Sequence, residues 1–369
     1  MKVRVPGILM NEKLSNISKM FDKVLKDCVT SNIKITLYFD HIRIQAMNER
    51  ITYTDDIFDV NTDISCDHKF SFLVDAGTLI SFFKNHNQDI EIEIKNDYSI
   101  VFKYDRGSFS STWIEDKAFP DFFYPVGDGI RVMSSSFIQS MKRSFAFVGS
   151  DEFRPAIGSI LLNVKKEYID IVSTDMFHLF INRKEYANAV EERSIMLSEV
   201  AASILYRFLS DKDTEISIST DGVRTFLCFD NVIISDTNVE QQYPNYEYVC
   251  NKFEKSSSVK FDRDLLISVL NSMTLVDNVV NVKVDKENGI TVMSEDFGNR
   301  KKIMESMPLN ALEGPCFNFS IGKENILSSV KSLIKGDTVM DWSDQYKMIK
   351  MFNPKYESTY VLNQTLYNL

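Results

Sequence analysis

Histidine, the residue that most often carries general acid–base catalysis, is scarce in this chain of 369 residues. Only four are present, His41, His68, His86 and His178, and none lies in an HExxH motif. The chain has no GxSxG nucleophile motif and no P-loop, because the glycines at 127 and 129 are not followed by Gly-Lys-Ser/Thr. We therefore expect no enzyme, no metal and no other cofactor, although a catalytic site without a local signature would escape these motifs.

The cysteines also lack the spacing of a functional cluster. Cys28, Cys66, Cys228, Cys250 and Cys316 are scattered, and no pair forms a CxxC. We expect free thiols and a cytoplasmic protein. The N-terminus lacks the apolar stretch of a secretory signal, and no apolar run approaches the ~18–20 residues of a membrane-spanning helix.

The chemistry that the sequence does offer is electrostatic. The net charge of −10, from 42 basic and 52 acidic residues, argues against a basic surface all round. A local basic stripe can coexist with that charge. Basic residues recur on the predicted helices: Lys13, Lys19, Lys23, Lys26, Lys84, Lys142, Arg143, Arg207, Arg263, Lys323, Lys331 and Lys335. Each could be an ordinary solvated residue, but as a set they could contact phosphates if the fold gathers the helices.

Strands dominate the elements that must position these residues. Hydrophobic and polar residues alternate with period two over 33–39, 41–45, 90–95, 216–219 and 280–284. Turn residues follow three of these strands, at 95–97, 220–222 and 287–289, and the last includes an Asn-Gly. A hydrophobic content of 44% excludes a disordered chain.

Six predicted helices recur with a regular spacing. Three begin near residues 13, 135 and 262, and three shorter ones begin near 76, 198 and 323, so the intervals lie between 122 and 127 residues. The first carries apolar residues at 3–4 spacing from 14 to 28, and the last is expected over 323–335, before Gly336. A third of the chain is 123 residues, so the spacing predicts a threefold repeat with domains 1–125, 126–250 and 251–369.

A second marker supports this period. Phe119-Pro120-Asp121-Phe122 ends the first predicted repeat, and Tyr243-Pro244-Asn245-Tyr246 ends the second, 124 residues later. Neither connector is rich in Ser or Gly, so we expect the repeats to pack against one another.

These segments resemble one family, the β subunit of bacterial DNA polymerase III, or β sliding clamp. Residues 153–162, which include Arg154-Pro155, are similar to the family's RP-x-L-x-G segment, and 171–179 to its strand ending in ATDGHRL. Residues 243–249 resemble FPDY-x-x-V, and 359–362 resemble the family's terminal strand. The family's Gly-His-Arg is replaced by Met176-Phe177-His178, and its terminal Met-Pro by Asn363-Gln364.

The resemblance implies an α+β fold with three repeated DNA-clamp domains per chain, helices lining a pore and antiparallel sheets on the outside. Two chains would form a ring-shaped homodimer that encircles double-stranded DNA without reading its sequence. The ring would act as a processivity factor, tethering a DNA polymerase and the clamp loader through a short linear motif. The basic residues on the helices would then face the DNA.

The resemblance also implies a pocket for that motif, on the central and C-terminal domains. The pocket residues would be Ala156, Thr174, Met176, Phe177, His178, Leu179, Pro244, Tyr248, Val249, Tyr346, Val361, Leu362 and Asn363. Thr174, Leu179, Pro244 and Val361 match the family's motifs most closely. An apolar groove of this kind suits a peptide with aliphatic and aromatic anchors. The alternative for the apolar members is that they are simply core residues of strands.

For the boundary between two chains, the resemblance points to Phe109, Thr274 and Leu275. An aromatic residue buried against aliphatic ones would accompany the pairing of two sheet edges. Packing of Phe109 within its own domain is nearly as consistent with the sequence. The alternative to a clamp is a β-rich structural ring or assembly protein with three repeats that never meets DNA.

Overall fold

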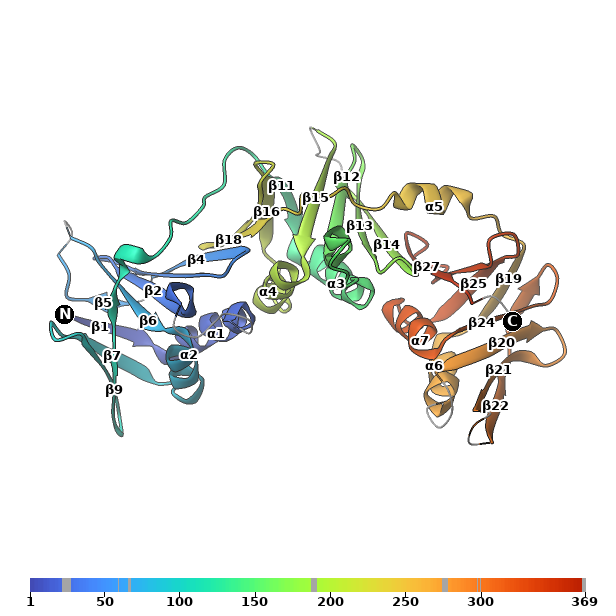
Figure 1. Ribbon diagram of the computed structural model, residues 1–369, viewed down its shortest axis with the longest axis horizontal. Helices are drawn as coiled ribbons and strands as arrows, with labels where there is room; N and C mark the ends of the chain where they lie inside the picture. Colours follow the sequence, from blue (N-terminus) through green and yellow to red (C-terminus); the bar gives the residue numbers. More distant parts are fainter. Residues whose placement is uncertain are drawn as a thin grey trace. The chain divides into compact units, whose positions relative to one another are not determined.

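The computed structural model describes residues 1–21, 28–58, 60–65, 68–186, 191–273, 278–296, 298 and 300–366. The chain divides into two compact units, and each combines two stretches of sequence. The first unit contains Met1–Gln139 and Val200–Asn238, and the second contains Ser140–Glu199 and Val239–Leu369. Figure 1 labels the elements, and each unit is described by itself below.

The first unit contains two sheets, and all strand pairs in them are antiparallel. The five-stranded sheet has the order β5 (Asn61–Thr62), β1 (Lys2–Pro6), β7 (Asp89–Ile94), β8 (Ser99–Tyr104), β9 (Gly107–Thr112). The nine-stranded sheet has the order β10 (Ile114–Glu115), β6 (Phe70–Asp75), β2 (Asn32–Leu37), β3 (Ile42–Met47), β4 (Ile51–Ile57), β18 (Val232–Thr237), β17 (Arg224–Phe229), β16 (Glu215–Thr220), β11 (Ile130–Met133).

The second unit also contains a nine-stranded sheet and a smaller one. The larger has the order β15 (Arg193–Ser198), β12 (Ser159–Val164), β13 (Tyr168–Thr174), β14 (His178–Glu185), β27 (Thr359–Gln364), β26 (Met348–Phe352), β25 (Asp337–Ser343), β19 (Ser257–Asp262), β23 (Ala311–Glu313). The smaller has the order β22 (Lys301–Met307), β21 (Gly289–Asp296), β20 (Val279–Asp285), β24 (Phe317–Gly322).

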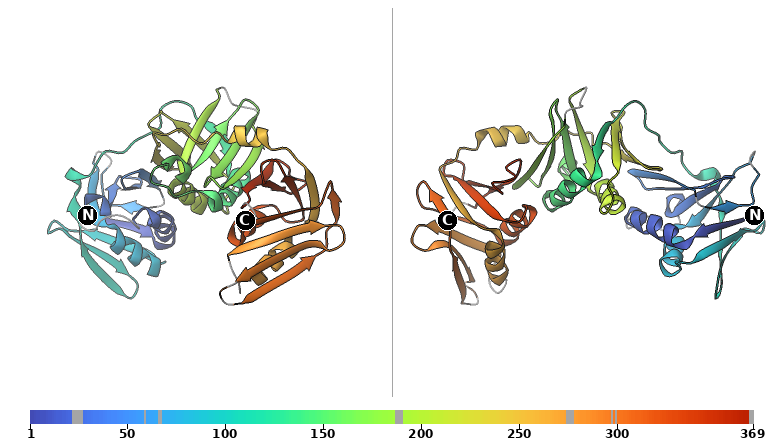
Figure 2. Two further views of the ribbon diagram at one scale, coloured as in Figure 1. Left: turned by 45° about the vertical axis from the view of Figure 1, so that its right-hand side comes forward. Right: turned by 180° about the vertical axis from the view of Figure 1, so that it is seen from behind.

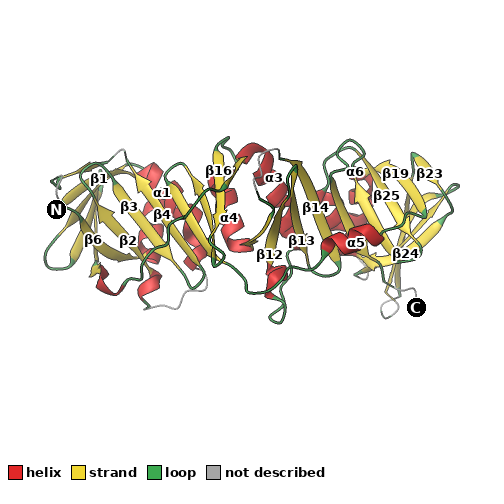
Figure 3. Ribbon diagram, turned by 90° about the horizontal axis from the view of Figure 1, so that it is seen from above, coloured by secondary structure: helices red, strands yellow, loops and turns green. Residues whose placement is uncertain are grey.

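Helices cover one face of these sheets in each unit (Figures 1 and 2). The described helices are α1 (Gly7–Ile17), α2 (Ala76–Asn85), α3 (Ser134–Ser144), α4 (Glu199–Leu209), α5 (Tyr246–Lys252), α6 (Arg263–Ser272) and α7 (Lys323–Ser332). The chain passes from one unit to the other within α3, after the first residue of α4 and just after β18. α5 differs from the others, because it lies across the strands on the face away from α3 (Figure 3).

The same order of elements occurs three times along the chain: strand, helix, four strands, helix, three strands. The first copy runs from β1 to β9, the second from β11 to β18 and the third from β19 to β27, with the short strands β5 and β23 added. The longer helices begin at residues 7, 134 and 263, and the shorter ones at 76, 199 and 323. We call these copies the first, second and third repeats.

The structure corrects the expected helices at three places. The first helix runs from Gly7 to Ile17, so it begins before residue 13 and ends well before residue 28. It follows β1 directly and has no side-chain cap to mark its start. The last helix ends at Ser332 rather than at 335, and Gly336, with φ +118°, lies in the loop after it. α5 was not expected, because seven residues are too few for a hydrophobic period.

Each junction between repeats is a pairing of two strands. The last strand of the second repeat, β18, pairs with β4 of the first, with Ile234 opposite Tyr53. The last strand of the third repeat, β27, pairs with β14 of the second in the same way. We call these two pairings the internal seams. They convert four strand edges into two continuous nine-stranded sheets.

A buried charge sits beside the first internal seam. The Asp55 side chain of β4 has no exposed surface, and its Oδ2 lies 2.8 Å from Lys13 Nζ of α1 and accepts a hydrogen bond from Tyr53. Burial raises the pKa of Asp55, and the Lys13 charge opposes that rise. A buried carboxylate of this kind depends on its cation, because charges removed from water are costly unless paired.

Replacing Lys13 with Met should therefore destabilise the fold by about 3–5 kcal/mol, because it leaves the Asp55 carboxylate buried without a cation. Chemical unfolding measures the loss. The control is Lys84→Met, which removes an exposed lysine from α2 and should change the free energy of unfolding by no more than about 0.5 kcal/mol. Equal stability of the two variants would contradict the importance of this pair.

Candidate functional site

The turn between β13 and β14 is held by one carboxylate. Asp175 Oδ1 accepts hydrogen bonds from the backbone N–H groups of Phe177 (2.9 Å) and His178 (2.7 Å), and its Oδ2 lies 2.7 Å from His178 Nδ1. Burial opposes the ionisation of Asp175, but these hydrogen bonds and the His178 ring hold its pKa below the ordinary value. These hydrogen bonds fix the backbone of the turn, and the side chains of Met176 and Phe177 are exposed on it.

Met176 occupies the position where the family pattern has Gly. Its φ of +77° lies in the left-handed region, which favours glycine. Thr174 compensates for the strain, because its Oγ1 accepts a hydrogen bond from Met176 N (3.0 Å) and donates one to the His178 carbonyl (2.6 Å). The Phe177 side chain is 65% exposed. The replacement of Gly-His by Met-Phe therefore adds two partly or largely exposed apolar side chains at this rim.

A pocket of about 280 Å³ opens beside this turn, within the second unit. Strands β13, β14, β26 and β27 and the segment that enters α5 contribute to it. Its lining contains no Lys, Arg, Asp or Glu: Thr174, Met176, Phe177, His178, Leu179, Pro244, Asn245, Tyr246, Val249, Tyr346, Met348, Leu362 and Gln364. Such a surface can bind an apolar peptide segment by burying its side chains, without a charged anchor.

Strand register decides which side chains reach the pocket. Across the second internal seam, Leu179 lies opposite Leu362, and Phe180 lies opposite Val361. Successive side chains of a strand point to opposite faces. Leu179 and Leu362 therefore share the pocket face, while Val361 is fully buried in the other core with Phe180.

The connector between the second and third repeats forms the opposite wall. The ring of Tyr243 is buried, and burial raises the pKa of its hydroxyl. Tyr246 OH donates to Asp170 Oδ2 (2.9 Å) and accepts from Asn163 Nδ2 (2.6 Å), so it holds the start of α5 against β12 and β13. The Asn245 side chain caps α5 by accepting a hydrogen bond from Tyr248 N.

Nine of the thirteen expected pocket residues line this pocket: Thr174, Met176, Phe177, His178, Leu179, Pro244, Val249, Tyr346 and Leu362. Four do not. Ala156 is buried beneath, in the cluster of Tyr243 and Tyr246, and Tyr248 is exposed beside the pocket. Val361 faces the other core, and Asn363 is buried, where it accepts a hydrogen bond from Ser329 of α7.

Asn245, Tyr246, Met348 and Gln364 also line the pocket, although they are not among the thirteen expected residues. Tyr246 and Asn245 lie within the aromatic-Pro-x-aromatic connector, so their neighbour Pro244 was the available signal. Met348 has no such signal. It reaches the pocket because β26 pairs with β27, which places Met348 opposite Gln364.

The structure divides the basic helix residues into two groups. Some serve the fold: Lys19 donates to Ser203, Arg207 donates to Ser15 O and Ser18 Oγ, and Lys323 is buried. Arg263 is also buried and donates to backbone carbonyls of α7. Lys13 forms the ion pair with Asp55.

Other basic residues remain at the surface. Lys84 of α2, Lys142 of α3 and Lys331 of α7 are exposed, as is Lys335, which lies after α7 ends. Arg143 is half-buried, and burial together with the charge of Arg263 lowers its pKa. Lys23 and Lys26 lie outside the described residues.

Strands β9 and β22 each pair with only one other strand among the described residues. β9 ends the five-stranded sheet, and β22 ends the four-stranded sheet. Phe109 of β9 is half-buried and stacks on Phe82 (5.5 Å between ring centroids) and Phe102 (5.9 Å) of its own repeat. Thr274 and Leu275 lie outside the described residues.

No group of three or more His, Cys, Asp or Glu side chains among the described residues could hold a metal ion. In the described ranges, no helix is long and apolar enough to cross a membrane.

Sequence comparisons relate the chain to curated proteins named β sliding clamp, although no family model matches it. The protein of Rickettsia bellii is 22% identical over 199 residues, which cover 50% of this chain and 52% of that protein. The protein of Buchnera aphidicola is 25% identical over 170 residues, which cover 44% and 46%. The chain thus aligns with about half the length of these relatives.

Solved structures of sliding clamps match the fold along its length. The DNA polymerase sliding clamp of Bacillus subtilis has a TM-score of 0.91 at 15% identity. The β subunit of DNA polymerase III from Thermotoga maritima has a TM-score of 0.89 at 16% identity. The clamp of Pseudomonas aeruginosa, solved with griselimycin bound, has 0.90 at 14%. Each match covers all of both chains.

Asp175 makes a testable contribution at the pocket turn. Because its folded-state pKa is below the ordinary 3.8, it stabilises the fold at neutral pH, and this contribution is lost as the pH falls through the folded-state pKa. Asp175→Asn should cost about 1 kcal/mol at pH 7, and the difference from the parent should shrink below pH 3.8. Unfolding by urea between pH 3 and 7 measures it; a difference that does not change with pH would contradict this role.

Proposed function

We propose that this chain, which has the fold of the bacterial β sliding clamps and resembles them in sequence, is itself a sliding clamp. Two copies would close into a ring around duplex DNA and tether a DNA polymerase to it, acting without catalysis and in the cytoplasm. The three repeats would be its domains, with boundaries at 1–125, 126–250 and 251–369.

The observation that carries this proposal is the pattern of strand pairing. In element order, β9 of the first repeat corresponds to β18 and β27, and β22 of the third corresponds to β4 and β14. The internal seams pair β18 with β4 and β27 with β14, so β9 and β22 are the two members of this set that lack a seam partner among the described residues. Pairing of β22 with β9 of a second copy would repeat the seam.

Such a contact is heterologous and satisfies both edges in each chain. Two copies would form two new seams, and a closed assembly would leave neither of these edges open. This requirement supports a closed homodimer. Phe109 lies on β9, where it would meet the second copy, and its packing on Phe82 and Phe102 would support that edge from within.

DNA contact in a closed ring needs only weak attraction to phosphates. Lys84, Lys142 and Lys331 come from helices of the first, second and third repeats, and all three are exposed. Contacts of lysine with phosphates are independent of sequence, which suits a protein that must slide. Lys19, Arg207 and Lys323 are less suited to this role, because their side chains bond within the fold or are buried.

The pocket supports the second half of the proposal. An uncharged, largely apolar pocket at the second internal seam would accept a partner's short linear motif with aliphatic and aromatic anchors. Because the pocket is built from both repeats, its shape depends on the pairing of β14 with β27. Polymerase and clamp loader would compete for it.

Topological retention on DNA tests the ring. The protein is cross-linked chemically in the presence of a nicked circular plasmid and passed through a sizing column in high salt. The cross-linked dimer should elute with the plasmid and lose it when the plasmid is cut once, because a closed ring slides off an end. A protein that sediments as a 42.5 kDa monomer at micromolar concentration, or that elutes free of the circle, would leave a structural assembly protein as the better reading.

Charge reversal at Lys84, Lys142 and Lys331 together should reduce the amount of ring trapped on the circle at least tenfold, without changing the dimer. The reason is that three lysines near the DNA become three repulsive carboxylates. The matched control reverses Lys69, Lys95 and Lys286, which are exposed outside the helices, and so changes the net charge equally. Equal trapping of the two variants would remove the DNA-facing role of the helices.

The pocket is tested by Val249→Asp. This residue is only partly buried, so the fold should survive, and a carboxylate in the pocket should weaken binding of a peptide with leucine and phenylalanine anchors at least 100-fold. Fluorescence anisotropy measures the affinity. The control is Val223→Asp, at an exposed turn of the first unit. Unchanged peptide affinity in Val249→Asp would refute the pocket.

A further inference from the structure

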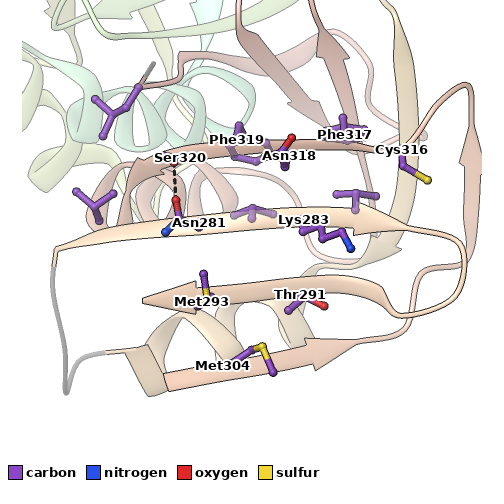
Figure 4. Close-up of a pocket in the computed structure, with 14 residues that line it drawn as sticks. Asn281, Lys283, Thr291, Met293, Met304, Cys316, Phe317, Asn318, Phe319 and Ser320 are labelled. Carbon is purple, nitrogen blue, oxygen red and sulfur yellow. Dashed lines mark hydrogen bonds between the residues drawn. The ribbon is translucent and has the colours of Figure 1, made fainter. Parts of the chain in front are cut away.

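The outward face of the sheet β22-β21-β20-β24 is hollowed and open. The hollow measures about 1160 Å³ and lies within the third repeat (Figure 4). Met293 of β21 lies opposite Met304 of β22, and Leu366 borders the same surface. Met304 is 62% exposed and Leu366 is 50% exposed. We call this surface the methionine face.

The first repeat covers the equivalent face with its own connector. After β9 the chain pairs with β6 through Ile114, two residues beyond the end of β9. It then brings Phe119 and Phe122, three positions apart, onto the outward side chains Met47 and Leu73. The two aromatic rings stack on each other, with 5.7 Å between their centroids.

The second repeat covers its face in a similar way. Tyr243 and Tyr246, again three positions apart, pack in one cluster with Val172 and Ile181, which are opposite each other on β13 and β14. The face of this sheet is therefore closed twice in the molecule by an extended segment with two aromatic residues at the same spacing. Figure 3 shows the second such segment continuing into α5, which lies across the strands.

Among the described residues, the third repeat has the same frame without the aromatic segment. Asn281 of β20 lies opposite Met293 of β21 and Ser320 of β24. In the second repeat, Leu161 of β12 lies in the same way opposite Val172 of β13 and Met196 of β15. By this register, Met293 and Met304 occupy the positions of Val172 and Ile181. Leu366 bridges to Ser320 of β24 two residues beyond the end of β27, as Ile114 pairs with β6 in the first repeat. The described chain ends at Leu366, and no described residue brings an aromatic pair onto the methionine face.

We propose that the methionine face is a docking site for an extended segment of a partner protein that carries two aromatic residues three positions apart. Methionine sulfur is polarizable and packs well on aromatic rings, so the Met293–Met304 pair suits such a ligand. The charges beside it are already satisfied, because Lys302 pairs with Glu295 and Lys283 pairs with Asp285. The face should thus select aromatic rings rather than charge. This site is separate from the pocket at the second internal seam and goes beyond the proposed clamp function.

The probe is a fluorescein-labelled peptide with the chain's own sequence from Gln242 to Tyr248, which carries the aromatic pair of the second repeat. Its binding to the full chain is followed by fluorescence anisotropy. We expect saturable binding that Met304→Lys weakens at least tenfold. Met133→Lys, which makes the same change at another exposed methionine, should leave it unchanged. A peptide with both aromatic positions changed to alanine should lose at least tenfold in affinity.

Three outcomes would overturn the proposal. Absence of saturable binding would do so, and so would binding that Val249→Asp abolishes but Met304→Lys leaves intact, since the peptide would then occupy the pocket. A variant that ends at Leu366 and binds the peptide at least tenfold more tightly would assign the face to the chain's own last three residues instead. None of these outcomes bears on trapping of the ring on circular DNA, so failure here is distinguishable from failure of the proposed function.

Discussion

The pairing of one repeat's last strand with the fourth strand of the repeat before it is the constraint on which the rest of the structure depends. A strand edge that is left open exposes a row of backbone donors and acceptors. Pairing of β18 with β4 and of β27 with β14 removes four such edges. The same logic, applied to β9 and β22, supports the proposed pairing of these two edges with a second copy of the chain. The proposed ring is therefore a consequence of how the repeats join.

The seams also decide where a ligand can bind. At the second internal seam, Leu179 and Leu362 meet because they are opposite each other on adjacent strands, and the connector closes over one side of them. A shift of β27 by one residue would bring Val361 to the pocket and bury Leu362. The pocket is thus a property of register, and neither repeat contains it alone. The methionine face shows the equivalent surface where no described residue brings an aromatic pair onto it.

Some of the basic side chains are bonded within the fold, and others are exposed at the surface. At the first internal seam, Lys13 neutralises Asp55, while Lys19 and Arg207 bond to groups on the facing helix. The side chains of these cations bond to groups of the fold, so they are less suited to contact phosphates. Lys84, Lys142 and Lys331 are exposed, so a phosphate backbone could reach them. An acidic chain can thus retain local positive charge on its helices.

Periodicity in the sequence was sufficient to predict the threefold recurrence of six helices and several of the strands. Alternation over 280–284 predicted β20, Asp262 marked the start of α6, and Asn288-Gly289 marked the turn into β21. These signals are local, because they depend on side-chain spacing within one element. The sequence did not predict the start of α1, because that helix has no side-chain cap, and it did not predict α5, because that helix is short.

By itself, then, the sequence determined the presence of six helices, their threefold spacing and the motifs of the pocket turn. Only the tertiary structure decided which face each side chain occupies: Val361 in the core, and Leu362 and Met348 in the pocket. It also decided that Lys323 is buried while Lys331 of the same helix is exposed. The physical reason is that these outcomes depend on register between strands far apart in the chain and on which helix packs opposite. Neither is encoded within one element, because both arise from pairing with another.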